Sequence, residues 1–232
     1  MKIIIIFFIT TIKLYSQNYS INIMGIHAAD IEQIKSDSGS IIFKTQNRGI
    51  FDFFWPTTNY YEAKFNPNNF VIKSWKKKIK QGDYQTSLFG LIDTNDVLIY
   101  NDKIKIKIPK ITHNIFSLLA MVQSYNAVNL DTKWFNLEHE GLFGKARFVW
   151  ADSSNIWNGG DSVLCDHYRL DISITDSLNK INKETDYFMK YIVNENFVRE
   201  VWVSKINSNS IIMAAKINTP WISVHAKINS LK

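Results

Sequence analysis

The chain has 232 residues, of which 46% are hydrophobic and 14% aromatic, and its formal net charge is +6. This length suffices for one domain with a sizeable core, and the sparse, scattered Gly and Pro residues give no sign of a linker. The single cysteine, Cys165, cannot form an intramolecular disulfide, so we expect a small buried apolar residue there. The fold must therefore depend on its core alone.

The apolar run at residues 3–12 ends at Lys13. It is about half as long as the roughly 20 residues that a membrane-spanning helix needs. We therefore predict a secretory signal peptide at residues 1–17, cleaved near Ser16 or Gln17, and export to the periplasm or outer envelope. The alternative is retention as a short membrane anchor, because the residues before the expected cleavage site are larger than is preferred.

The rest of the chain, residues 18–232, alternates repeatedly between apolar and polar residues. The best example is residues 103–108, where Lys and Ile alternate as in a half-buried antiparallel strand. Strands are also predicted at residues 19–24, 26–35, 40–46, 60–65, 70–80, 83–92, 97–100, 134–140, 146–151, 163–175, 188–195, 197–205, 211–217 and 222–228. Residues typical of turns separate many of these segments, which favours successive hairpins.

Two segments depart from this alternation. Residues 112–125 place apolar side chains at helical spacing, and Thr112 or Asn114 could cap the helix start. The aromatic segment at residues 49–56 is expected to be a loop or short helical turn that tucks its side chains beneath the sheet. We therefore predict a mostly β fold in one domain: a single curled antiparallel sheet or partly open β-barrel with one short helix packed on it. A two-layer sandwich is the alternative.

The order of these elements is similar to that in a known protein family. An opening hairpin contains Gly25 and the pair Ala28-Ala29, and Tyr-Tyr-Glu-Ala at residues 60–63 follows the aromatic segment. Ile108-Pro109 leads into the predicted helix, and residues 200–204 precede a turn and two closing strands. In this order the chain resembles a family of exported bacterial proteins known as domain of unknown function 3108. The resemblance implies a curled β-rich sheet in the periplasm or outer envelope, and it brings no reaction and no catalytic residues.

Lysines are concentrated at residues 75–80 and 103–107, both in predicted strands. Lysines on exposed or edge strands commonly serve solubility and block edge-to-edge pairing, so we interpret both clusters as solvated faces. Attraction to anionic lipid or polysaccharide is the alternative. We expect no nucleic-acid partner and at most peripheral contact with a membrane, and the sequence makes no prediction of oligomeric state.

Residues that could carry chemistry are scattered. None of the five histidines has a second ligand at a recognised metal spacing, and alternation in Glu138-His139-Glu140 would point His139 away from both glutamates. Asp166-His167, with Asp171 and Ser173, lacks the arrangement of a hydrolase, because adjacent strand residues face opposite sides. We therefore predict no catalytic residue, metal or cofactor, and expect that the protein is not an enzyme.

The seven tryptophans are unusual for a chain of this length. Aromatic residues are common core filler in β proteins, but a curved sheet can also leave a groove lined by them. The candidate ligand-binding residues are Trp75, Ile115, Leu118, Leu119, Trp134, Trp150 and Trp202. The predicted function is a non-enzymatic periplasmic or envelope protein that binds a lipid or other apolar ligand. The alternatives are a structural or protein-interaction module of the envelope and, third, a hydrolase of unknown type.

Overall fold

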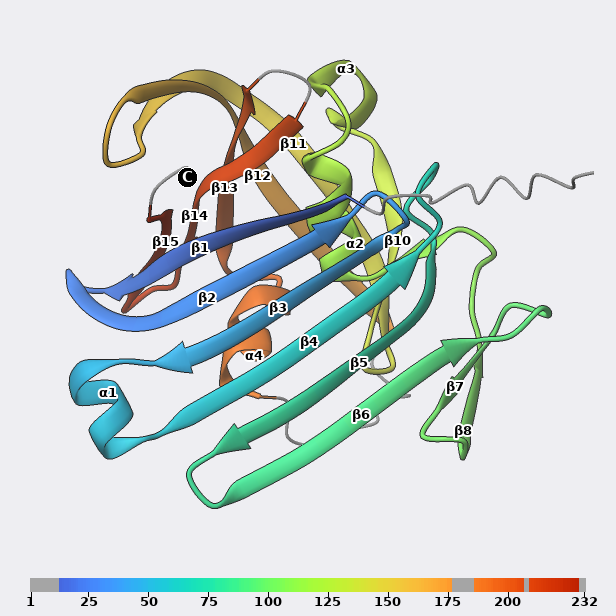
Figure 1. Ribbon diagram of the computed structural model, residues 1–232. Coiled ribbons are helices and arrows are strands. Elements are labelled where there is room, and N and C mark those ends of the chain that lie inside the picture. Colours follow the sequence, from blue (N-terminus) through green and yellow to red (C-terminus); the bar gives the residue numbers. More distant parts are fainter. Residues whose placement is uncertain (1–12, 177–185, 207–208, 230–232) are drawn as a thin grey trace, which may run out of the picture.

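The computed structural model describes residues 13–176, 186–206 and 209–229. Its strands form one 15-stranded sheet in the order β8-β7-β6-β5-β4-β3-β2-β1-β15-β14-β13-β12-β11-β10-β9 (Figure 1). Almost every strand therefore pairs with its neighbour in the chain, as successive hairpins require. The exception joins the two ends of the chain, because β1 pairs with β15 and places Tyr19 opposite Ile228. Most of the expected signal peptide, residues 1–12, lies outside the described residues.

The first half of the sheet comprises β1 (Leu14–Ile23), β2 (Ile26–Ser36), β3 (Ser40–Asn47), β4 (Thr57–Phe65), β5 (Ile72–Gln81), β6 (Tyr84–Ile92), β7 (Val97–Tyr100) and β8 (Ile104–Lys107). The second half comprises β9 (Thr112–His113), β10 (Trp134–His139), β11 (Leu142–Trp157), β12 (Ser162–Asp176), β13 (Val198–Ile206), β14 (Asn209–Asn218) and β15 (Ser223–Ile228). The paired strands run antiparallel, except that β9 runs parallel to β10.

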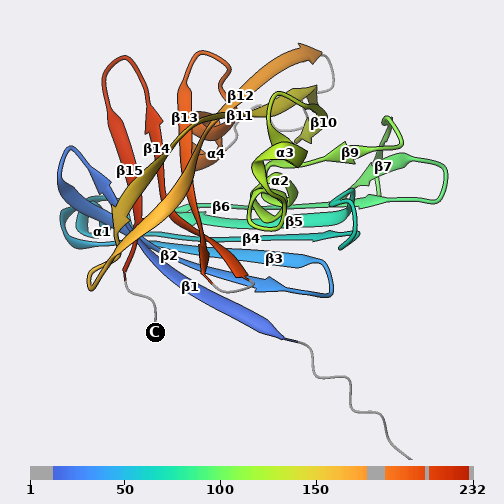
Figure 2. The same ribbon diagram turned by 90° about the horizontal axis from the view of Figure 1, so that it is seen from above.

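The sheet curls so that its halves face each other, with helix α2 (Ile115–Val122) between them (Figure 2). This helix contacts β3 and β4 of the first half and β10 of the second. It begins where the sequence predicts, because the Asn114 side chain accepts a hydrogen bond from Ser117 N at 2.8 Å. Strands β8 and β9 are the free edges of the sheet. The prediction of a mostly β fold with an unclosed curled sheet is confirmed.

Three further short helices are present in the described residues: α1 (Gly49–Phe54), α3 (Ala127–Leu130) and α4 (Tyr187–Val193). The strand predicted at residues 188–195 was wrong, because this segment forms α4. Its buried Met189, Ile192 and Val193 follow helical spacing, and the Asp186 side chain caps the helix by accepting from Met189 N at 2.9 Å. Among the described residues, no helix is long and apolar enough to cross a bilayer.

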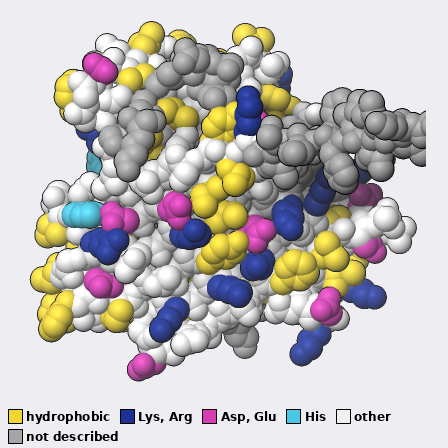
Figure 3. Space-filling model, viewed as in Figure 1, with side chains coloured by type: hydrophobic (Ala, Val, Ile, Leu, Met, Phe, Trp, Pro, Cys, Tyr) yellow, Lys and Arg dark blue, Asp and Glu magenta, His cyan; other side chains and the backbone are white. Residues whose placement is uncertain are grey.

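Helix α1 does not tuck its aromatic side chains beneath the sheet, so that prediction was also wrong. Phe53, Phe54 and Trp55 are 81%, 73% and 61% exposed. The physical reason is position: α1 connects the ends of β3 and β4 and lies beside β2 and β3 at the rim of the sheet, where none of its residues is buried. Figure 3 shows hydrophobic side chains gathered along the left edge of this view, where Figure 1 places α1.

The two lysine clusters differ in their surroundings. On the edge strand β8, Lys105 and Lys107 are exposed, as predicted. On β5, Lys78 is exposed but Lys77 is fully buried, because it shares the inner face with Trp75 and Ile79. The prediction of a solvated face was therefore wrong for Lys77. Across the outer face in Figure 3, Lys and Arg side chains are mixed with acidic ones.

Candidate functional site

The interior of the curled sheet contains an apolar cavity of about 130 Å³. Its walls come from α2, from α4 and from strands on both sides of the β1–β15 junction, where side chains such as Tyr19 and Val201 face inward. Ala215 of β14 and Ala226 of β15 lie directly opposite each other and both line the cavity. Because each contributes only a methyl group, the space above them is left unfilled. We call this space the apolar cavity.

Two of the candidate ligand-binding residues, Ile115 and Leu119 of α2, line the apolar cavity. Leu118 and Trp75 are buried in other parts of the core, at 0% and 2% exposure. The helix turns Leu118 away from the wall that Ile115 and Leu119 form, and Trp75 lies in β5, which contributes nothing to the cavity wall. Ligand binding by these residues stays a prediction.

The other three candidates do not line the apolar cavity. Trp134 and Trp150 are 46% and 42% exposed, and Arg147 lies over the Trp134 ring at 4.5 Å. Trp202 stacks on His167 at 4.3 Å between ring centroids. The alternation of their strands places these tryptophans away from the cavity, so the seven candidates do not form one groove.

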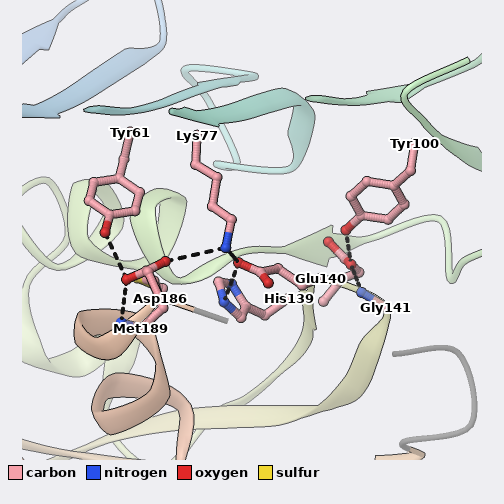
Figure 4. A network of polar contacts seen from close by, with 9 residues as sticks. Tyr61, Lys77, Tyr100, His139, Glu140, Gly141, Asp186 and Met189 are labelled. Atoms are coloured by element: carbon pink, nitrogen blue, oxygen red, sulfur yellow. Dashed lines mark hydrogen bonds and ion pairs between the residues drawn. The ribbon is translucent and has the colours of Figure 1, made fainter. Parts of the chain in front are cut away.

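A second interior feature is a buried polar network, which sequence reasoning missed (Figure 4). We use this name for the following residues: Tyr61, Lys77, Tyr100, Glu138, His139, Glu140 and Asp186. The first three come from β4, β5 and β7 of the first half. The others lie at the end of β10 and at the start of α4, so the network joins the two halves.

Lys77 is at the centre of the polar network. Its Nζ donates to Glu140 Oε1 and, at 3.3 Å, to Asp186 Oδ2, while its side chain is 0% exposed. Asp186 also accepts from the Tyr61 hydroxyl at 2.8 Å and from Met189 N. Asp186 thus receives three donors and is fully satisfied in spite of its burial.

Glu138 occupies the other end of the network. Its Oε1 accepts from Gly141 N at 2.8 Å and from the Tyr100 hydroxyl. Burial raises the pKa of Glu138 to about 7, more than these hydrogen bonds lower it. Burial, together with the nearby Glu138 carboxylate, raises the pKa of Tyr100 well above its usual value, so this phenol stays protonated and acts as a donor.

His139 stacks on Trp75, with ring centroids 5.8 Å apart, and its Nε2 lies 3.5 Å from Glu140 Oε1. The prediction that it would point away from both glutamates was therefore wrong for Glu140. Strand β10 ends at His139, and Glu140 and Gly141 form a turn with φ of 51° and 81°, which ends the alternation. Burial lowers the pKa of His139, which keeps the imidazole neutral.

The other residues considered for chemistry are dispersed. His167 pairs with Asp152 at 3.1 Å and with Glu200 at 3.2 Å, whereas Asp171 binds Arg147 and Arg169. The structure therefore does not build an acid, base and nucleophile from the Asp166 to Ser173 segment. Within residues 13–176, 186–206 and 209–229, no group of three or more His, Cys, Asp or Glu side chains could hold a metal ion. Cys165 is buried, as expected.

Comparisons with known proteins bear on the fold. No protein-family model and no curated protein matches the chain. Among solved structures, the chain is similar to a β-barrel-like protein of domain of unknown function DUF1849 from Brucella abortus. The TM-score is 0.59 at 8% sequence identity, and the match covers 93% of this chain and 95% of that one. At this identity the likeness establishes a shared fold alone, so the chain has the fold of a β-barrel-like domain, and membership of family 3108 is not confirmed.

Proposed function

We propose that the protein is a non-enzymatic binding module of the bacterial cell envelope that holds the apolar part of a lipid or other amphiphile. The observation that carries this proposal is the apolar cavity between α2 and the junction of the two halves. Ligand sites in proteins are typically concave and mostly apolar, with few polar groups. Leu119, Ile217 and Val224 give the cavity such a wall.

The size of the apolar cavity limits what it can hold. Sites for whole small molecules have volumes of roughly 300–1,000 Å³, whereas this cavity measures about 130 Å³. An engineered apolar cavity of roughly 150 Å³ stays dry and binds benzene. The buried part of the ligand is therefore short, such as one ring or the end of an acyl chain, and the rest of the molecule lies outside.

Exposed apolar residues lie close to this cavity. Trp221, in the turn that joins β14 to β15, is 88% exposed, and both strands line the cavity. Met24, in the turn between β1 and β2, is 76% exposed and follows Ile23, which pairs with Val224. Apolar tips of this kind can dip into the interface of a membrane. They support peripheral contact with the bilayer from which an amphiphile would be taken.

Export and kinship with family 3108 belong to the same proposal. Export is supported by the apolar run at residues 3–12, which is too short to span a bilayer as a helix. Kinship is supported by the order of elements, in which the strand β8 is followed by Pro109 and then by α2. A protein with these properties would work in the periplasm or outer envelope.

Native mass spectrometry of protein purified from the periplasm tests the proposal. The wild-type protein should carry a co-purified lipid or amphiphile. Ala226→Leu fills the apolar cavity and should abolish the adduct. Ala214→Leu is the matched control, because Ala214 is adjacent to Ala215 in β14 but does not line the cavity. A wild-type protein without any adduct, or an adduct that persists in Ala226→Leu, would contradict the proposal.

A second candidate function, a protein-interaction module of the envelope, is favoured by α1. Four of its residues or flanking residues, Ile50, Phe53, Phe54 and Trp55, are more than half exposed, and such patches commonly mark interaction sites. Replacing Phe53 and Phe54 by Ser should then abolish capture of a specific envelope protein in a cross-linked pull-down. Retention of the same partner by this double variant would exclude α1 as its binding surface.

A further inference from the structure

A second cavity, of about 330 Å³, lies beside the polar network. It shares no lining residue with the apolar cavity. His139 and Glu140 of the network form part of its wall, and Lys190 of α4 with residues 193–196, at the end of α4 and after it, form much of the rest. Its volume falls within the range of roughly 300–1,000 Å³ that is usual for sites of small molecules. We call this space the polar cavity.

The charges of the polar network do not balance among the described residues. Lys77 is its one ammonium group, and it faces two carboxylates, Glu140 and Asp186. His139 does not supply the missing positive charge, because burial keeps its imidazole neutral. A buried carboxylate without a full complement of donors or positive charge is strongly unfavourable. Among the described residues, the network therefore carries one negative charge in excess.

The shortage falls on Glu140. Asp186 receives three donors, whereas Glu140 receives Lys77 on Oε1 and its buried Oε2 has no hydrogen-bond partner in the described part of the chain. Both ring nitrogens of His139 likewise lack a hydrogen-bond partner among the described residues. His139 and Glu140 are 2% exposed, and both line the polar cavity. Two residues that carry unsatisfied acceptors therefore form part of the wall of one space.

We propose that the polar cavity binds a small organic cation with N–H donors, an alkylammonium or a guanidinium group. Its positive charge pairs with Glu140 Oε2, and a second N–H donates to an unprotonated ring nitrogen of His139. Glu195 in the same wall adds a carboxylate, while the Lys190 side chain, which also lines the cavity, is exposed, so its charge is hydrated. This site is independent of the apolar ligand proposed above.

The nature of the donor set favours an organic cation over a metal ion. His139 and Glu140 provide two ligands from the network, and no set of three or more metal-ligating side chains is present in the described residues. Structural and catalytic metal sites generally use at least three protein ligands. An ammonium or guanidinium group instead needs acceptors with a net negative charge, which this wall supplies.

Isothermal titration calorimetry on the full chain tests this inference with n-propylammonium chloride. Propan-1-ol and sodium propionate serve as neutral and anionic probes of similar size. Propylammonium should bind saturably and raise the midpoint of thermal unfolding, and the other two should do neither. Failure of propylammonium to bind, or equal binding of propan-1-ol, would overturn the inference. Neither result bears on the proposal of an apolar ligand, because that ligand is measured by mass spectrometry.

Substitutions at Glu140 and His139 test whether these residues bind the cation. Glu140→Gln keeps the size of the side chain but removes its charge, and should weaken propylammonium binding by about tenfold to a hundredfold. Glu32→Gln is the matched control, because Glu32 lies in β2 and pairs with Lys44 away from the cavity. His139→Phe preserves stacking on Trp75 and removes the acceptor, so it should also weaken binding even if Glu140→Gln fails to fold. Unchanged affinity in His139→Phe or in folded Glu140→Gln would contradict the assignment.

Discussion

Lys77 and Glu140 are 63 positions apart in the chain and form an ion pair in the interior, where their side chains are 0% and 3% exposed. Lys77 comes from β5 of the first half and Glu140 from the turn after β10 of the second. Because both groups are removed from water, each depends on the other for stabilisation. The pair therefore ties the packing of the two halves to one relative position.

Replacing Lys77 by Met should destabilise the protein strongly. The variant leaves Glu140 without its donor and removes one of the three donors of Asp186. Removing one partner of a buried ion pair typically costs about 3–5 kcal/mol. The free energy of unfolding, measured with urea, should fall by about this amount.

The control for this prediction is Lys78→Met, one residue further along β5. Lys78 is exposed, and surface substitutions usually change stability by less than about 0.5 kcal/mol. If Lys77→Met proved as mild as Lys78→Met, Lys77 would not be paired in the interior.

Stability should depend on pH through Glu138. The pKa of this carboxyl group is raised from 4.5 to about 7 in the folded protein. Between these values the unfolded chain releases the proton while the folded protein keeps it, so stability falls as pH rises from about 5 to 7. Below this window both states are protonated, and above it both are ionised. The loss is roughly 3 kcal/mol at 1.36 kcal/mol per pKa unit.

The measurement compares wild type with Glu138→Gln in urea unfolding at pH 5, 6, 7 and 8. The amide oxygen of Gln can still accept from Gly141 N, which donates to Glu138 at 2.8 Å. The variant should therefore gain stability relative to wild type as pH rises. Parallel pH profiles for the two proteins would show that Glu138 does not titrate in this range.

The elements that the sequence predicted well are those whose pattern is local. Strand β4 was placed because Tyr61, Ala63 and Phe65 alternate with polar or half-buried residues along it, and α2 because its apolar residues share helical spacing above a capping Asn114. For α4, the local pattern led to the wrong prediction of a strand. A run of aromatic and aliphatic residues such as 188–193 can satisfy either period, and the capping contact of Asp186 decides for the helix.

The polar network could not be predicted for a different reason. A lysine in a run of lysines is normally solvated, and the partners that bury Lys77 lie 63 and 109 positions away. One signal was present: Trp75, Lys77 and Ile79 are in phase, so the alternation of β5 already places Lys77 on the apolar face. The apolar cavity gave no signal, because it depends on Ala215 and Ala226 meeting across two strands.

Removing the cap of α2 should weaken the fold. Asn114 Oδ1 accepts from Ser117 N, and Ser117 Oγ in turn accepts from Asn114 N at 3.1 Å, which together form a capping box. Asn114→Ala should therefore cost about 1–2 kcal/mol in thermal or urea unfolding. Asn126→Ala, at the exposed cap of the four-residue α3, should cost about 0.5 kcal/mol. Equal losses for both variants would mean that the Asn114 cap contributes little to the stability of α2.

The expected cleavage site can be determined by N-terminal sequencing of protein from a periplasmic extract. Cleavage near Ser16 or Gln17 falls within β1, which begins at Leu14. A mature chain that begins at Gln17 keeps the hydrogen bond from Gln33 Nε2 to Gln17 Oε1, at 3.2 Å. We expect a start at Gln17 or Asn18, and only the first of these keeps this buried bond. A start at Ser20 or later would contradict the assigned site.

The pairing of β1 with β15 has a consequence for how the chain reaches its native state. Tyr19 and Ile228 are opposite each other in the sheet although the whole domain lies between them in sequence. Contacts this distant carry a large loop-closure entropy and slow folding. Each hairpin can form from neighbouring segments of the chain alone, but β1 keeps an open edge until β15 pairs with it. The period of greatest aggregation risk therefore lasts until the C-terminal strand has joined the sheet.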